Sequence, residues 1–242
     1  MATYKIAPTD LTFLLDQCPL CFVRKVKHKI VLKTAFPSIF HDIHDVVEKG
    51  AHAGEPADFD IPGEYFDRPD KTTIASAPLP VGNDFVVLNG REDKLGAIQA
   101  DDSFLLVDLK TSKPKPDYER LYWRQLMSYY TIRQNPADTA NFRNVSGMGL
   151  LWIQPEIYVD LKREMQRLHA VGSFIDALLE NMNLDKRLLT SWKYEYTPIE
   201  IDQEAFDALL VDVVDLLNTP LPDIMPGDKC GPCLWARQIA NL

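Results

Sequence analysis

Apolar and polar positions along the chain predict a mixture of strands and helices. The segment 104–110 is almost continuously apolar, which is typical of a strand buried on both faces and therefore central in a sheet. Shorter apolar runs predict strands at 84–88, with 91–99 continuing the sheet, and at 149–153. The segment 192–201 alternates and predicts another strand, near an edge because Pro198 cannot donate a ladder hydrogen bond.

Apolar residues at helical spacing predict the helices. We expect helices at 117–133 and 202–218, and the segment 161–182 repeats apolar residues at the same spacing. Another helix is expected to begin at Thr9, a residue type that caps helices, and to break at Pro19.

The composition fits a packed globular protein. The chain has 242 residues, enough for one substantial domain, with 46% apolar and 25% charged residues. No apolar run approaches the roughly 20 residues that span a bilayer, and the N-terminus lacks a basic segment followed by an apolar one. We therefore expect a cytoplasmic protein with no membrane partner.

The charge distribution limits the ways in which the protein could bind nucleic acid. Its net charge of −9 argues against a protein that coats nucleic acid through overall charge, but not against an enzyme that holds a few phosphates. Two local basic regions are either solvated faces or phosphate-contacting strips: Arg24, Lys25, Lys27, His28, Lys29 and Lys33, and then Lys113, Lys115, Arg120 and Arg124.

The cysteines form two Cys-x-x-Cys pairs at opposite ends of the chain, Cys18 with Cys21 and Cys230 with Cys233. In a cytosolic protein such pairs more often indicate metal or redox chemistry than disulfides. Four thiolates suit a tetrahedral Zn²⁺ ion or an iron–sulfur cluster. In either case the sequence predicts a clasp between the segments 9–33 and 220–242.

Two aspartates and a lysine are candidates for chemistry. A two-residue turn at 101–102 would place Asp93 opposite Lys110 in a hairpin. Side chains alternate faces with a period of two, so Asp108 shares a face with Lys110, and Asp93 joins them because paired residues project to the same side. This group is either a structural salt-bridge cluster or a site where the carboxylates hold Mg²⁺ or Mn²⁺.

The helix that follows supplies two further candidates. Gln125 and Tyr129 are four residues apart and share a helix face, with Tyr122 in line three residues earlier. A glutamine and a tyrosine on one face can hold a phosphate oxygen and stack on a base. The alternative is an ordinary helix whose polar positions face water.

The order and spacing of these motifs resemble a known enzyme family. Gly90-x-x-Asp93, Asp108-x-Lys110 and Gln125-x-x-x-Tyr129 resemble the PD-(D/E)XK nuclease superfamily, specifically the RecB-type exonuclease branch that includes the CRISPR-adaptation nucleases. The resemblance covers nearly the whole chain. It implies a single α/β domain over 1–242, with a restriction-endonuclease-like mixed sheet flanked by helices.

The resemblance also implies roles for individual residues. Asp93, Asp108 and the Leu109 carbonyl would bind Mg²⁺ or Mn²⁺, Lys110 would be catalytic, and Gln125 and Tyr129 would contact DNA. A histidine on an early helix often adds a ligand in this branch. His44-Asp45-Val46-Val47-Glu48 is similar to that pattern, although Phe40 replaces the usual glycine and His41 is an alternative.

In this branch the terminal cysteines hold a 4Fe–4S cluster, usually with one cysteine at the N-terminal side and three at the C-terminal side. Here the distribution is two and two, and Zn²⁺ is the alternative. The function implied is a metal-dependent DNA nuclease, an exonuclease on single-stranded or end-containing DNA, with DNA-repair, recombination or CRISPR-adaptation proteins as partners. The alternatives are a catalytically silent nucleic-acid-binding or assembly subunit and a metal-clasped redox protein.

Overall fold

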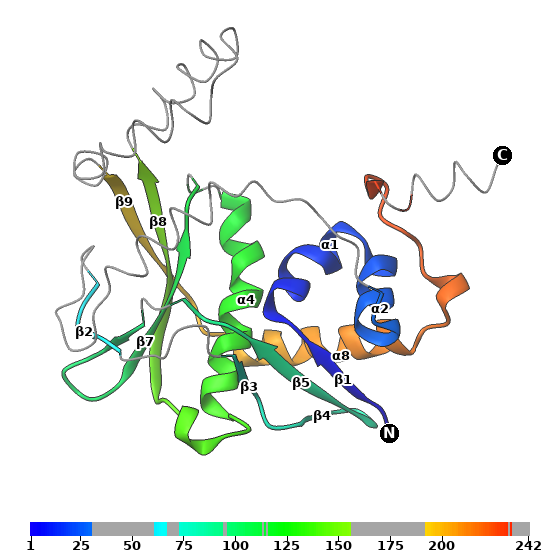
Figure 1. The fold of residues 1–242 in the computed structure, drawn as a ribbon, viewed down its shortest axis with the longest axis horizontal. Helices are drawn as coiled ribbons and strands as arrows, with labels where there is room; N and C mark the ends of the chain where they lie inside the picture. The colour runs from blue at the N-terminus through cyan, green and yellow to red at the C-terminus, as the bar shows by residue number, and fades with distance from the viewer. Residues whose placement is uncertain are drawn as a thin grey trace, which may run out of the picture.

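The fold is taken from a computed structural model, which describes residues 1–30, 61–66, 73–93, 96–112, 114, 116–155, 192–231 and 233. Two mixed β-sheets with helices packed against them make up the described part of the chain (Figure 1). The segment 161–182 and the candidate ligands His41 and His44 lie outside the described residues, as do Lys33, Lys113 and Lys115. Within the described residues, no helix is long and apolar enough to cross a membrane.

The larger sheet has the strand order β2-β6-β7-β8-β9. Its strands are β2 (Glu64–Tyr65), β6 (Ala97–Ile98), β7 (Phe104–Lys110), β8 (Val145–Pro155) and β9 (Trp192–Ile199). β7 and β8 are parallel, and the other pairs are antiparallel. The predicted central position of 104–110 is confirmed, because six of the seven residues of β7 are buried and the strand pairs on both sides.

The smaller sheet is built around β5 (Asp84–Gly90). The strand β1 (Thr3–Ile6) pairs with β5 in parallel, and β3 (Ile74–Ala75) and β4 (Leu79–Val81) pair with it in antiparallel fashion. The end of β5 leads directly into the segment 91–93, which carries the first candidate aspartate. Only the short β6 represents the predicted sheet continuation among the described residues of 91–99.

The helix α4 (Pro116–Gln134) connects the parallel strands β7 and β8 and contacts strands of both sheets (Figure 1). A crossover helix between adjacent parallel strands packs back onto its sheet, which places the N-terminal half of α4 beside the end of β7. Leu126, Met127 and Ile132 of this helix are fully buried. The predicted helix at 117–133 is therefore confirmed, and it forms the centre of the core.

The terminal segments pack together on one side of the molecule. The chain runs from β1 into a π-helical turn, η1 (Asp10–Leu14), then α1 (Leu15–Gln17) and α2 (Pro19–His28). The predicted cap at Thr9 is wrong, because its side chain makes no capping hydrogen bond. The predicted break at Pro19 is confirmed, since Cys18 is extended between α1 and α2.

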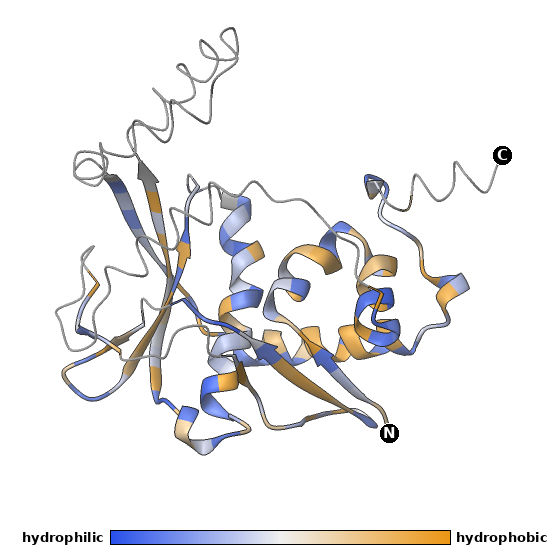
Figure 2. Ribbon diagram, viewed as in Figure 1, coloured by the Kyte–Doolittle hydropathy of each residue, from blue (hydrophilic) through white to orange (hydrophobic). Residues whose placement is uncertain are grey.

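The helix α8 (Gln203–Asn218) packs against α2 and α4. Asp202 caps it by accepting a hydrogen bond from the Ala205 N–H at 2.9 Å. The predicted apolar face is confirmed, since Phe206, Leu210, Val213, Val214 and Leu217 are buried. Figure 2 shows the concentration of apolar residues along α8. The short turn η4 (Leu221–Asp223) then leads to the second cysteine pair.

Candidate functional site

The end of β7 carries an ion pair that is almost closed to solvent. Asp108 is buried, and its Oδ2 lies against the ammonium of Lys110, whose side chain is 13% exposed. Both residues come from the same face of one strand, as their spacing of two predicts. The strand β7, which is otherwise apolar, therefore places a carboxylate and an ammonium group next to each other at its end.

Asp93 joins this point from the segment after β5. Its Oδ2 accepts a hydrogen bond from the backbone N–H of Leu109 at 2.5 Å. The prediction that Asp93 pairs directly with Lys110 is wrong by one position, because β6 and β7 pair Ala97 with Leu105. Asp93 nevertheless acts electrostatically on both Asp108 and Lys110.

The register differs because the hairpin turn is longer than predicted. The Gln99 N–H donates to the Ser103 carbonyl at 2.8 Å, so three residues lie between this pair, and the two-residue turn is wrong. Asp102 adopts the left-handed conformation, with φ 61°, that a three-residue hairpin loop requires. Asp101 stabilises the turn by accepting hydrogen bonds from the N–H and hydroxyl of Ser103.

Gln125 of α4 bridges the two charged groups of β7. Its Nε2 donates to Asp108 Oδ1 at 3.1 Å, and its Oε1 accepts from Lys110 Nζ at 3.3 Å. The amide can serve a carboxylate and an ammonium at once, because it carries both a donor and an acceptor. Its predicted contact with DNA stays a prediction, and in this structure Gln125 orients Asp108 and Lys110.

Tyr129 lies one turn further along α4 and is 2% exposed. Its hydroxyl donates a hydrogen bond to the Arg91 carbonyl at 2.5 Å. The ring is therefore covered in this structure, and the predicted contact of Tyr129 with DNA stays a prediction. Tyr129 instead fixes the backbone two residues before Asp93.

Arg133, near the end of α4, holds the residue beside Asp93. Its guanidinium donates to both carboxylate oxygens of Glu92, at 2.6, 3.0 and 3.1 Å, and to the Asn141 carbonyl. The rings of Phe66 and Phe104 lie against the guanidinium. Sequence reasoning missed this pair. The only available signals were an acid next to Asp93 and an arginine four residues after Tyr129.

The electrostatics of the cluster follow from its burial. Burial raises the pKa of the Asp108 carboxyl to about 7, with a further rise from the Asp93 carboxylate, and Lys110 only partly offsets this. Burial lowers the pKa of Lys110, but the carboxylates of Asp108 and Asp93 outweigh it, so that pKa lies above its ordinary value.

The buried oxygen of Asp108 is compensated by the ion pair. Asp108 Oδ2 lies against the Lys110 ammonium, and Asp93 lies close enough to raise the pKa of the Asp108 carboxyl. Two carboxylates and one ammonium therefore share this buried point. A cation at the cluster would have to compete with Lys110 for Asp108.

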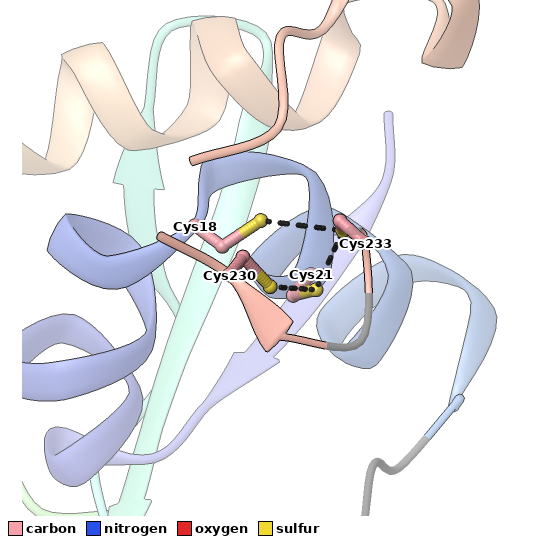
Figure 3. A group of neighbouring side chains, drawn as sticks. All are labelled: Cys18, Cys21, Cys230 and Cys233. Carbon is pink, nitrogen blue, oxygen red and sulfur yellow. Dashed lines mark hydrogen bonds between the residues drawn. The ribbon is translucent and has the colours of Figure 1, made fainter. Parts of the chain in front are cut away.

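The second candidate site is the cysteine quartet (Figure 3). The Sγ atoms of Cys18, Cys21, Cys230 and Cys233 all lie within 4.8 Å of one another, and all four residues are buried. Cys21 Sγ lies 3.5 Å from the Sγ atoms of both Cys230 and Cys233. The predicted meeting of the two pairs is confirmed, and the four thiols could hold a metal ion.

The backbone brings the second pair close to the first at Gly227. The Gly227 N–H donates to Cys18 Sγ at 3.3 Å. A Cβ at this position would lie 2.0 Å from the Gln17 carbonyl oxygen, so only glycine permits the approach.

The thiols of the quartet differ in acidity. Burial raises the pKa of Cys18, but hydrogen bonds from the Gly227 and Cys21 N–H groups and from the thiols of Cys21 and Cys230 bring it down to about 7. Burial is the largest contribution that raises the pKa of Cys21, and it raises that of Cys233 to about 11. The shifts of these three thiols therefore differ in direction, with the pKa of Cys18 lowered and those of Cys21 and Cys233 raised.

Comparison with known proteins identifies no family for this chain. No family model and no curated protein matches the sequence. A solved structure described as "Crystal structure of SSO0001" is 14% identical, with a TM-score of 0.44, and the match covers 90% of this chain and 78% of that chain. A likeness of this degree carries no functional argument.

Proposed function

We propose that the protein is a metal-dependent DNA nuclease with a PD-(D/E)XK-type site at Asp93, Asp108 and Lys110. The observation that supports this most is that the carboxylates of Asp93 and Asp108 meet beside the Lys110 ammonium at the end of β7. Two carboxylates close together are suited to a hard divalent cation.

The donor set fits Mg²⁺ or Mn²⁺. Asp93 and Asp108 would hold the ion with the Leu109 carbonyl, since these hard cations prefer oxygen ligands. His44, or else His41, would be a further ligand, and both lie outside the described residues. When bound, the ion stabilises negative charge on the phosphate and lowers the pKa of a coordinated water.

The protein side chains would position the reacting groups. The Lys110 ammonium would donate to a phosphate oxygen, or orient the attacking water, and stabilise the charge that develops. Gln125 keeps Lys110 and Asp108 in a fixed relation through its two hydrogen bonds. Tyr129 and Arg133 hold the segment that carries Asp93.

The test is cleavage of labelled DNA in Mn²⁺ by the wild type and by Asp108→Ala and Lys110→Ala. We expect the wild type to cut and both variants to lose at least about 100-fold in rate, the usual effect of removing a catalytic acid–base or charge-stabilising group. Wild-type cleavage no faster than that of the variants would contradict the proposal.

A catalytically silent DNA-binding subunit is the second candidate. The ion pair between Lys110 and Asp108 favours it, because part of the charge of Asp108 is neutralised without any cation. DNA binding that is unaffected by Lys110→Ala, with no cleavage in Mg²⁺ or Mn²⁺, would establish this alternative.

We propose that the cysteine quartet holds a structural metal centre that clasps the two ends of the chain. The family resemblance implies a 4Fe–4S cluster. Zn²⁺ is the alternative, and four buried thiols whose Sγ atoms all lie within 4.8 Å of one another are compatible with either group. The absorbance and metal content of freshly purified protein distinguish the two, because a cluster is brown and zinc is colourless.

A further inference from the structure

Tyr122 lies beside Lys110 and contacts two further aromatic rings, and we call Phe13, Tyr118 and Tyr122 the aromatic wall. The Lys110 Nζ is 4.1 Å from the centroid of the Tyr122 ring. The rings of Phe13 and Tyr118 meet Tyr122 edge to face, with centroids 5.7 and 5.9 Å away. The wall therefore borders the proposed phosphate-contacting lysine through the Tyr122 ring, which Phe13 contacts in turn.

Phe13 is the exposed member of the wall, at 41%, while Tyr118 and Tyr122 are partly buried. The buried Trp152 lies behind the two tyrosines, stacked on Tyr118 and edge-on to Tyr122. Tyr118 and Tyr122 thus pack against the buried Trp152, and Phe13 forms the solvent-exposed edge of the wall.

The exposure of Phe13 is imposed by its local structure. Its neighbours Leu11 and Thr12 are fully buried, and the Thr12 hydroxyl donates to the Pro8 carbonyl at 3.0 Å. The π-helical turn η1 that carries Phe13 is tied to α4, since Arg124 donates to the Leu11 carbonyl at 3.3 Å and pairs with Asp16. A π-helical turn is uncommon and frequently occurs at functional sites.

This combination fits a single-stranded nucleic acid better than a duplex. An exposed ring held in place can stack on an unpaired base, whatever the sequence, because every base has a π-face. In a duplex the base faces are already stacked on one another. A strand whose phosphate lies at Lys110 would present its neighbouring base to the wall.

We propose that the aromatic wall is the base-stacking subsite of the protein and that it selects single-stranded DNA, with Phe13 as its main contact. The proposal rests on the proposed function for the position of the phosphate at Lys110. The binding of bases itself requires no cleavage, so the two can be tested separately.

The test is the affinity of Phe13→Ala for two fluorescent probes about 12 nucleotides long. One is oligodeoxythymidine and the other is an abasic strand of the same length, and both are measured in EDTA so that no metal-dependent cleavage occurs. We expect Phe13→Ala to weaken oligodeoxythymidine binding about 5- to 30-fold and abasic-strand binding less than about 2-fold. Phe13→Trp should retain the wild-type affinity, because it keeps an aromatic face.

Phe142→Ala is the matched control, since Phe142 is also an exposed phenylalanine, at 49%. Phe142 lies just before the start of β8, whereas Lys110 pairs with Trp152 near the other end of that strand. The paired length of β7 between these two ends, from Phe104 to Lys110, spans roughly 20 Å. We expect no effect of Phe142→Ala on either probe. Equal weakening of both probes by Phe13→Ala, or no weakening of either, would overturn the proposal.

DNA cleavage by the wild type, measured separately, distinguishes this proposal from the nuclease proposal. If the wild type cuts DNA and Phe13→Ala binds normally, the wall is not the subsite and the nuclease proposal stands. If the base-dependent loss is seen without cleavage, the subsite stands and the nuclease proposal fails.

Discussion

Arg133 holds Glu92 through three hydrogen bonds from one guanidinium, and Glu92 is the residue directly before Asp93. Arg133 is 2% exposed and Glu92 is also buried, so the charges are paired away from water. Together with the bond from Tyr129 to Arg91, this pair fixes the two residues before Asp93 against α4. The first metal-binding aspartate of the proposed site is thus positioned by the far end of the helix.

Arg133→Met should destabilise the protein by about 3–5 kcal/mol, because it leaves the Glu92 carboxylate buried without its partner. The double variant Arg133→Met/Glu92→Met should recover part of this loss, since it removes the unpaired charge. Urea unfolding measures both variants. If the single variant is as stable as the wild type, the pair has no role in holding Asp93.

The pH dependence of stability should report the buried Asp108. The pKa of its carboxyl rises from 3.8 to about 7 on folding, so the folded state binds more protons between these values and its stability falls as pH rises through this window. Asp108→Asn removes the effect, so in EDTA its stability should change less between pH 5 and pH 8 than that of the wild type. Urea unfolding at the two pH values measures this.

Asp101→Asn is the matched control for this measurement. Hydrogen bonds from Ser103 lower the pKa of Asp101, so its contribution is present above its unfolded pKa and is lost at acidic pH. Asp101→Asn should therefore remove a rise in stability with increasing pH, whereas Asp108→Asn should remove a fall. Addition of Mn²⁺ should stabilise the wild type more than Asp108→Asn, because an ion that binds only the folded wild type stabilises it.

Gly227→Ala should open the cysteine clasp. The new Cβ would lie 2.0 Å from the Gln17 carbonyl oxygen, so the segment must move and the Gly227 N–H loses Cys18 Sγ. We expect lower metal content by elemental analysis and a melting temperature lower by several degrees. Gly231→Ala is the control on the same segment, because its Cβ would meet nothing within 4 Å. Equal metal content in the two variants would contradict this account.

Tyr129→Phe should lower stability by about 0.5–1.5 kcal/mol, since it removes the bond to the Arg91 carbonyl while keeping the packed ring. We expect its affinity for oligodeoxythymidine in EDTA to remain within about 2-fold of the wild type, because a buried ring does not meet the bases. Fluorescence anisotropy checks this. A large loss of affinity would restore the direct DNA contact predicted from the motif.

The strands and helices were predictable from the sequence where the pattern of buried apolar residues alone determines them. The apolar run of β7 predicts a buried strand, and the apolar faces of α4 and α8 predict helices, and few other structures would bury these residues. The approach of the two cysteine pairs was also predictable, because two Cys-x-x-Cys pairs in one chain are typical of a shared metal site.

The wrong register prediction depends on a single residue of turn length, and the contacts that were not predicted depend on long-range packing. Asp102 accepts a positive φ and lengthens the turn by one residue, which a two-residue count at 101–102 cannot anticipate. The burial of Tyr129 depends on the path of the segment 91–93, and the contact of Phe13 with Tyr122 joins residues more than 100 positions apart. Helical periodicity identifies a shared face but not what covers it.

The helix α4 carries Tyr122, Gln125, Tyr129 and Arg133 at intervals of three or four residues, and each meets a different part of the protein. Every one of these contacts depends on the same helical phase. A one-residue insertion after Tyr122 would turn all later side chains by about 100°, and so would separate Asp108, Arg91 and Glu92 from their partners at once. This stretch of the chain can therefore change by substitution but not in length.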